Sequence, residues 1–456
     1  MKKRKQMDMT NDPIAFSLIF FAIPLFAGSI FQQLYNTADL LFVGNLVGKT
    51  AAAAVGAGST LVTCLIGLFT GISVGAGVAA AQAVGAGDLE KVDKVMHTAA
   101  AFSIAAGIAM TVLGETAAGS ILRLLQTPEN VMADAVDYIR LYFLGMLPMI
   151  VYNVGAGILR ACGDSGTPFR ILAVGGFLNV ITDAFMIGGL HMGVRGAAVA
   201  TTVSQTFSAV AVCVVLAKGN SVLKLKLSRI RVWKGYLGTI LQLGLPAGIQ
   251  SMLITLSNIV VQYYINGFGE DAVAAFSAYF RLESFAYLPV LAFGQAATTF
   301  VGQNYGAGKM QRVKKGMVVA GSISVGCVAV IAFGLLAVGS TAVGWFVKDE
   351  SVIAIGMQII SISFPFYWLN SLVEVLGGTL RGMGRSLTSM IVILVSLCGF
   401  RIVLLWCVDH RWHTIKALAA VYPVTWGLAA ALLLAAVVVL LKKNRGIKNN
   451  IERIKK

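Results

Sequence analysis

Twelve long apolar stretches dominate the sequence, and their length constrains the fold more than any other feature. Each runs for about 20 to 30 residues, enough to cross the hydrocarbon core of a bilayer as a helix. Only helices and closed barrels can cross a bilayer, because lipid offers the backbone no hydrogen-bond partners. The stretches do not alternate strictly between apolar and polar residues, so they predict helices. The expected spans are 14–44, 51–80, 97–118, 136–160, 169–189, 196–217, 236–266, 272–302, 316–346, 354–380, 387–408 and 417–441.

The scarcity of charged residues supports an all-α polytopic membrane protein. Of the 456 residues, 57% are apolar and only 12% are Asp, Glu, Lys or Arg. Soluble chains carry about 25% charged residues, so this chain cannot cover a large soluble surface. Intrinsic disorder, a secreted disulfide scaffold and a separate soluble domain are excluded as the main interpretation. The six Cys and four His residues are scattered without metal-like spacing, so no metal site is expected beyond a possible Na⁺.

The basic residues fall mostly on one side of the predicted membrane. With both termini on one side, that side receives 27 of the 36 Lys and Arg residues, and the other side receives six. This asymmetry places both termini in the cytoplasm. The net charge of +16 then reflects topology and contact with anionic lipid, and no nucleic-acid partner is expected. The expected layout is a tail at 1–13, an N-lobe at 14–217, a basic linker at 218–235, a C-lobe at 236–441 and a basic tail at 442–456.

An internal repeat divides the chain into two halves of six helices. Because six is an even number, the second half enters the membrane in the same sense as the first, which defines a parallel repeat. Two such lobes suit alternating access, with substrate and ion sites near the lobe interface. Two pairs of segments match at one constant offset, QAVGAG at 82–87 with QNYGAG at 303–308, and LRACGDS at 159–165 with LRGMGRS at 380–386. Pro24 and Asn36 match Pro246 and Asn258 at an offset longer by one position.

Four carboxylates lie inside the apolar stretches, namely Asp39, Asp183, Glu283 and Glu374. A charge near the bilayer centre costs about 2.5–3.5 kcal/mol on insertion scales, so each needs a reason. The functional interpretation is an ion or substrate site. The structural alternative is a pair with a nearby Arg or a position near the interface. Asp39 favours function most clearly, because it is the only charge between Pro13 and Lys49.

The first half gathers oxygen ligands at one depth. Asp183 follows Asn179 by four residues, so both side chains share one helix face. Asp39 and Thr201 are expected in the same outer half of the membrane, and Asn153 is a further candidate. Carboxylates, amides and hydroxyls suit a proton or a hard monovalent cation. The sequence therefore predicts a coupling-ion site in the N-lobe.

The second half does not copy this site. The repeat partner of Asp39 is Val261, and that of Asp183 is Leu404 or Leu405, so ion chemistry is expected mainly in the N-lobe. Glu283 has two possible structural partners, Arg281 and Arg401.

The remaining candidates line the expected C-lobe part of the cavity. Glu374 stands at the repeat position of Asn153, where it would attract cations. Tyr279 and Tyr367 are aromatic candidates that would face an organic cation through cation–π contacts, although most such rings in membrane helices simply pack.

The sequence resembles the multidrug and toxic compound extrusion (MATE) family from about residue 24 to residue 441. The resemblance implies a V-shaped antiporter that exports organic, often cationic, drugs in exchange for Na⁺ or H⁺. It also implies a coupling-ion site at Asp39, Asn153, Asn179, Asp183 and Thr201. The segments that carry it are QLYNTAD at 33–39, FVG at 42–44, GAG at 85–87 and 306–308, LRACGD at 159–164, NVITD at 179–183 and GAAVAT at 196–201.

The sequence departs from the family pattern in the second half. The stretch 236–266 has no acidic residue, where some relatives carry one, so a C-lobe sodium site is not expected. This departure, with two carboxylates that can share one proton, tilts the coupling ion toward H⁺ over Na⁺.

Other functions fit the sequence less well. A lipid-linked oligosaccharide flippase of the same superfamily is the alternative, but such relatives typically have fourteen helices and a cationic cavity. A channel or receptor lacks support from any filter-like loop, and an enzyme from any nucleophile–base set. The expected protein is therefore a monomeric transporter without a cofactor, in the cell membrane of a prokaryote, whose partners are a small organic substrate, a coupling cation and the lipid bilayer.

Overall fold

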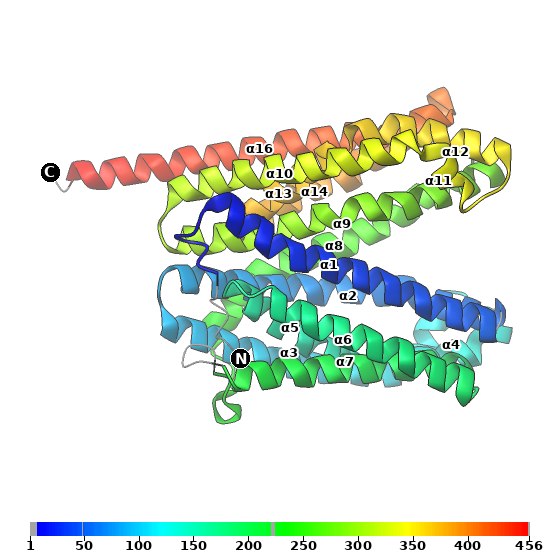
Figure 1. The fold of residues 1–456 in the computed structure, drawn as a ribbon, viewed down its shortest axis with the longest axis horizontal. Helices are drawn as coiled ribbons and strands as arrows, with labels where there is room; N and C mark the ends of the chain where they lie inside the picture. The colour runs from blue at the N-terminus through cyan, green and yellow to red at the C-terminus, as the bar shows by residue number, and fades with distance from the viewer. Residues whose placement is uncertain (1–6, 48, 220–223, 455–456) are drawn as a thin grey trace. The chain divides into compact units, whose positions relative to one another are not determined.

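The computed structural model describes residues 7–47, 49–219 and 224–454, and every regular element in this part of the chain is a helix (Figure 1). The elements of the first half are α1 (Ile14–Phe42), η1 (Val43–Val47), α2 (Lys49–Gly85), α3 (Leu89–Leu124), α4 (Glu129–Leu144), α5 (Met146–Ala161), α6 (Gly166–Asp183), η2 (Ala184–Gly189), α7 (Gly193–Ala217) and η3 (Leu227–Arg229). Those of the second half are α8 (Lys234–Asn266), α9 (Glu270–Gly306), α10 (Met310–Ala337), α11 (Gly339–Gly344), α12 (Glu350–Ser363), η4 (Phe364–Phe366), α13 (Trp368–Gly382), α14 (Ser386–Ile393), η5 (Leu394–Phe400), α15 (Arg401–Cys407), η6 (Val408–Trp412) and α16 (Ile415–Ile454).

Within the described residues, eleven helical segments are long and apolar enough to cross a membrane, and one further span is bent. The bent span joins Glu350–Phe366 to Trp368–Gly382 at an angle of 46°. Pro365 lies at this bend, in the short 3-10 turn η4, where its missing N–H favours a break in the helix. With the bent span counted once, the structure has the twelve expected spans, and the all-helical membrane fold is confirmed.

The backbone repeats with the same period as the sequence. Gly87 and Gly308 both adopt left-handed φ angles, 71° and 69°, and Gly163 and Gly384 adopt 84° and 78°. The members of each pair are related by the constant offset of the sequence repeat. Glycine is the residue that enters this conformation without steric cost, so each pair ends a helix in the same way. The two halves therefore share one structural frame.

The chain divides into two compact units. Unit 1 consists mainly of Ile19–Met252, and unit 2 consists mainly of Leu253–Tyr305 and Lys309–Lys456. The boundary falls inside α8, whose first half packs on α2 within unit 1. A Cβ on Gly71 would lie 2.1 Å from the backbone nitrogen of Gly248, so only glycine permits this crossing. Such small residues let membrane helices approach at backbone distance.

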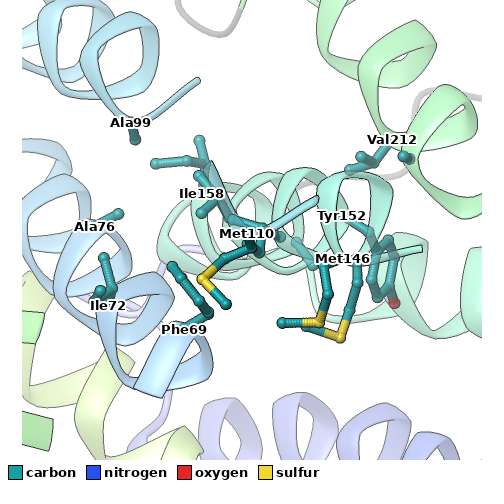
Figure 2. Packing of buried hydrophobic residues seen from close by; sticks show 14 of the residues in the cluster. Phe69, Ile72, Ala76, Ala99, Met110, Met146, Tyr152, Ile158 and Val212 are labelled. Carbon is teal, nitrogen blue, oxygen red and sulfur yellow. The ribbon is translucent and has the colours of Figure 1, made fainter. Parts of the chain in front are cut away.

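Apolar side chains from several helices fill the core of unit 1. Figure 2 shows Phe69 and Ile72 of α2 beside Met110 of α3 and Met146 of α5. Tyr152 is the one labelled residue with a polar side-chain group, and its hydroxyl donates a hydrogen bond to the Pro168 carbonyl at 3.0 Å. Residues of α2, α3, α5 and α7 thus share one apolar core, and α6, which carries Asp183, packs against α7.

Aromatic rings dominate the core of unit 2. Tyr367 packs edge-on against Trp426 with ring centroids 5.1 Å apart, and against Phe364 at 6.0 Å. Pairs of this kind contribute about 0.5–1.5 kcal/mol beyond the apolar area that they bury. Phe364 and Tyr367 lie at the bend between α12 and α13, and both of these helices pack against α16, which carries Trp426.

The described part of the expected basic linker at 218–235 is hydrogen-bonded to α3. Residues 220–223 of the linker lie outside the described residues. The Lys226 backbone N–H donates to Nε2 of the buried His97 at 3.1 Å. The Trp233 N–H donates to Oγ1 of Thr98 at 3.4 Å. Of the two expected tails, residues 1–6 and 455–456 also lie outside the described residues.

Candidate carboxylate site

The two first-half carboxylates lie where regular helices give way to π-helical turns. Asp39 is in the last turn of α1, and η1 begins four residues later. Asp183 is the last residue of α6, and η2 follows directly. The two π-helical turns contact each other. Widened turns of this kind often occur at functional sites, because they interrupt the regular backbone ladder beside a side chain.

Buried oxygens of Asp183, Asn179 and Asp39 lack hydrogen-bond partners among the described residues. The Asp183 side chain is 0% exposed, and among the described residues neither of its oxygens has a hydrogen-bond partner. One oxygen of Asp39 and the amide oxygen of Asn179 have none either. Asp39 also lies within electrostatic range of Asp183. Buried carboxylates that are not paired are costly. These oxygens therefore fit a cation or a proton as their missing partner.

Tyrosines surround the two carboxylates. Tyr138 and Tyr142 of α4 interact electrostatically with Asp39, and Tyr138 also interacts with Asp183. The Tyr35 ring of α1 lies against Gly176 of α6, where an added Cβ would come within 2.9 Å of the ring. The site thus has walls from α1, α4 and α6. Tyr138 and Tyr142 were not among the residues expected from the sequence, although their i,i+4 spacing was visible there.

Asn153 and Thr201, the other two expected ligands, lie on α5 and α7. The Asn153 amide donates to the Met149 carbonyl of its own helix at 3.0 Å. Thr201 is partly buried on the helix that packs against α6. Among the described residues no hydrogen bond joins either side chain to Asp39 or Asp183. The structure therefore brings together Asp39, Asp183 and the adjacent Asn179, and the role of Asn153 and Thr201 stays a prediction.

Glu283 of unit 2 belongs to a different kind of cluster. Its Oε1 accepts a hydrogen bond from the Tyr367 hydroxyl at 3.2 Å. Of its two possible basic partners, Arg401 is within electrostatic range, and Arg281 instead lies over the Phe346 ring, with its guanidinium carbon 5.7 Å from the ring centroid. The structure thus favours Arg401 as the charge that balances Glu283.

Glu374 is also balanced by an arginine. Its Oε2 accepts from Nη2 of Arg381 at 3.1 Å, and the two side chains are 17% and 11% exposed. Tyr279 and Tyr367 are fully buried, so neither ring offers an open face to a substrate in this conformation. The proposed roles of Glu374, Tyr279 and Tyr367 in substrate binding stay predictions.

These features define a multi-pass membrane protein made of two repeated six-helix halves, with uncompensated carboxylates buried in the first half. The sequence model of the MatE family matches residues 24–185 and 246–407, one copy on each half. The chain therefore belongs to the MATE family of membrane transporters, as the sequence predicted.

Individual proteins agree with this assignment. The chain is 29% identical over 400 residues to the probable multidrug resistance protein YpnP of Bacillus subtilis (strain 168), covering 87% of this chain and 89% of YpnP. It is 27% identical over 437 residues to the probable multidrug resistance protein YoeA of the same organism, covering 94% of each. A crystal structure of MATE in complex with MaL6 superposes with a TM-score of 0.90 at 23% identity, covering 97% of this chain and 100% of that chain. At this identity the superposition supports the fold.

Proposed function

We propose that the protein is an antiporter that exports organic cations or amphipathic compounds across the cell membrane in exchange for H⁺ or Na⁺. The observation that carries the proposal is a pair of carboxylates, partly buried Asp39 and fully buried Asp183. Among the described residues, one oxygen of Asp39 and both oxygens of Asp183 have no hydrogen-bond partner. Multi-pass transport proteins place ionisable groups in the membrane for ion or substrate pathways. The names of YpnP and YoeA, both probable multidrug resistance proteins, support drugs as the substrate class.

The two carboxylates supply a mechanism for coupling. When both are ionised in a dry site they repel each other, and one proton or one Na⁺ relieves the repulsion. Binding the cation would then draw α1 toward α6, since each helix carries one carboxylate. Drug and cation favour different conformations in this scheme, so each lowers the affinity of the transporter for the other by the same factor.

Topology and assembly complete the proposal. Both termini and the basic linker are on the cytoplasmic side, where the excess of Lys and Arg predicts them. The protein works as a monomer, because each chain contains both repeated halves. No cofactor takes part: the gradient of the coupling cation drives export, and no covalent chemistry is involved.

Transport by purified protein in proteoliposomes tests the proposal. A fluorescent cationic drug is measured while a Na⁺ gradient and a pH gradient are imposed separately. Export should follow one gradient and disappear in Asp39→Asn protein. Asp134→Asn is the matched control, since Asp134 is an exposed carboxylate of α4 in the same unit. Export by the unmodified protein that ignores both gradients would refute cation coupling.

A further inference from the structure

Arg401 of unit 2 stands in the repeat position of the carboxylate site of unit 1. At the constant offset of the sequence repeat it corresponds to Val180, between Asn179 and Asp183. The offset holds across this region without a gap, because matching or similar residues occur on both sides of Arg401. These matches are Ser165 with Ser386, Val194 with Ile415, Arg195 with Lys416 and Ser204 with Thr425.

Of the two groups that hold Arg401, one stands at the repeat position of a predicted ion ligand. The Arg401 guanidinium lies over the Tyr422 ring, 5.1 Å from its centroid, and its Nη2 donates to Oγ1 of Thr425 at 3.2 Å. Tyr422 corresponds to Thr201, which the sequence predicts as a ligand of the coupling ion. A π-helical segment, η6, follows the helix that carries Arg401, as η2 follows the helix that carries Asp183. Unit 2 thus places a guanidinium and one of its partners at positions that correspond to the predicted ion site of unit 1.

The charges of the two clusters differ in a corresponding way. Asp39 and Asp183 carry two negative charges when ionised, with no ion pair among the described residues. In unit 2 the negative charge of Glu283 lies within electrostatic range of the positive charge of Arg401, which is only 6% exposed. The nitrogen Nε of Arg401 has no hydrogen-bond partner in the described part of the chain. Among the described residues, Glu283 and Arg401 do not form a direct ion pair. The contacts that hold the guanidinium are therefore those with Tyr422 and Thr425.

We propose that Arg401 is a tethered cation: its guanidinium, which is covalently attached, occupies in unit 2 the position that corresponds to the exchangeable-cation site of unit 1. The inference rests on the proposed cation coupling and deepens it. Unit 2 then stays in its cation-bound form throughout the cycle, and the carboxylates of unit 1 alone exchange their cation with the gradient. A covalently attached guanidinium cannot dissociate. Unit 2 therefore keeps the same charge state during the transport cycle, while unit 1 alternates between cation-bound and cation-free states.

Chemical rescue tests whether Arg401 acts as a bound cation. Arg401→Ala removes the guanidinium and should lower drug export about tenfold or more, because Glu283 loses its balancing charge. Methylguanidinium is the probe, and Glu283, which is partly exposed, is the carboxylate that it would balance. It should raise the thermal unfolding midpoint of the purified variant and restore export about fivefold, since a ligand that binds only the folded state stabilises it. The unmodified protein should not respond.

Two further variants make the rescue specific. In Glu283→Gln/Arg401→Ala the negative charge is gone, so methylguanidinium should have no effect on the unfolding midpoint. Arg281→Ala is the matched control, because this arginine is exposed on the helix that carries Glu283. If Arg401→Ala cannot be purified as folded protein, the yield of folded Glu283→Gln/Arg401→Ala protein provides the test. Recovery of folded protein supports the proposal that Arg401 balances the charge of Glu283, and no recovery overturns it.

The result that overturns the inference is separable from failure of the proposed function. An Arg401→Ala protein that is folded and indifferent to methylguanidinium, in both stability and export, shows that Arg401 is not a cation substitute. The stability measurement uses neither drug nor gradient, so it remains valid even if the unmodified protein proves to be uncoupled. Loss of gradient dependence in the unmodified protein would refute the coupling alone.

Discussion

The two units share a backbone frame and treat buried charge in opposite ways. In unit 1, Asp39 and Asp183 lie within electrostatic range of each other, and their buried oxygens have no hydrogen-bond partner among the described residues. In unit 2, Glu374 pairs with Arg381, and Glu283 lies within electrostatic range of Arg401. The buried carboxylate oxygens of unit 1 thus lack partners among the described residues, whereas each of these unit 2 carboxylates has an arginine within electrostatic range.

Comparison of the two units shows which residues recur between the repeated halves and which do not. The left-handed glycines at Gly87 and Gly308 recur because the same turn needs the same backbone freedom. The carboxylates do not recur, since Val261 and Leu404 occupy two of the corresponding positions. A repeated frame thus preserves architecture, and charges that are unbalanced in only one copy indicate function.

The largest effect is expected from Asp39→Asn. The amide keeps the size of the side chain and removes the charge that would hold the cation, so coupled export should fall by about tenfold or more. Expression should stay largely intact, because an uncompensated buried charge is lost. Drug resistance of cells and proteoliposome transport measure the effect. Full resistance in Asp39→Asn cells would make Asp39 a structural residue and remove the asymmetry between the units.

The next effect concerns competition between drug and cation. Drug affinity of the purified protein should weaken as the coupling cation rises, by about 5- to 150-fold if the coupling is of the usual size. Asp183→Asn should flatten this dependence, because only one carboxylate then remains. Binding measured by fluorescence over separate Na⁺ and pH series provides the test. Equal drug affinity across both series in the unmodified protein would contradict the exchange of a cation in unit 1.

Neutralising one member of the balanced pair in unit 2 should chiefly affect stability. Glu374→Gln leaves Arg381 nearly buried without its carboxylate, which should cost about 1–3 kcal/mol of unfolding free energy, less than for a fully buried pair. Glu374→Gln/Arg381→Met should recover part of that loss. Thermal unfolding in detergent measures both variants. If the single variant lost transport while keeping its stability, Glu374 would belong to the substrate or ion pathway.

Much of this organisation was predictable from local sequence. Helix length and apolar content gave the twelve spans, and the constant offset between matching segments gave the repeat. The isolation of Asp39 in a long apolar stretch, and the four-residue spacing of Asn179 and Asp183, gave the core of the candidate site. These features depend on residues near one another in the chain or on a fixed offset, so they need no knowledge of packing.

The partners of the charged groups were harder to predict. The approach of Tyr138 and Tyr142 to the carboxylates depends on how α4 packs in unit 1, which no sequence interval encodes. The Glu374–Arg381 pair spans two helical turns and requires the long arginine side chain to reach back along one face. Neighbours in sequence can also mislead, as Glu283 shows: its balancing charge is far along the chain at Arg401, although Arg281 is only two positions away.

The smallest effect is therefore expected from Arg281→Gln, which sharpens the comparison within unit 2. Residues two positions apart point to different faces of a helix, so Arg281 and Glu283 do not face each other. Arg281 is exposed and lies over Phe346, a contact that glutamine can partly replace. We expect a change in unfolding free energy of about 0.5 kcal/mol or less and unchanged drug export. The same change at Arg401 should be far larger, because its charge is buried. Both variants are measured by thermal unfolding under one set of conditions. Equal losses of unfolding free energy from Arg281→Gln and Arg401→Gln would show that an arginine of its own helix balances the charge of Glu283. Arg401 would then be no different from an ordinary surface arginine.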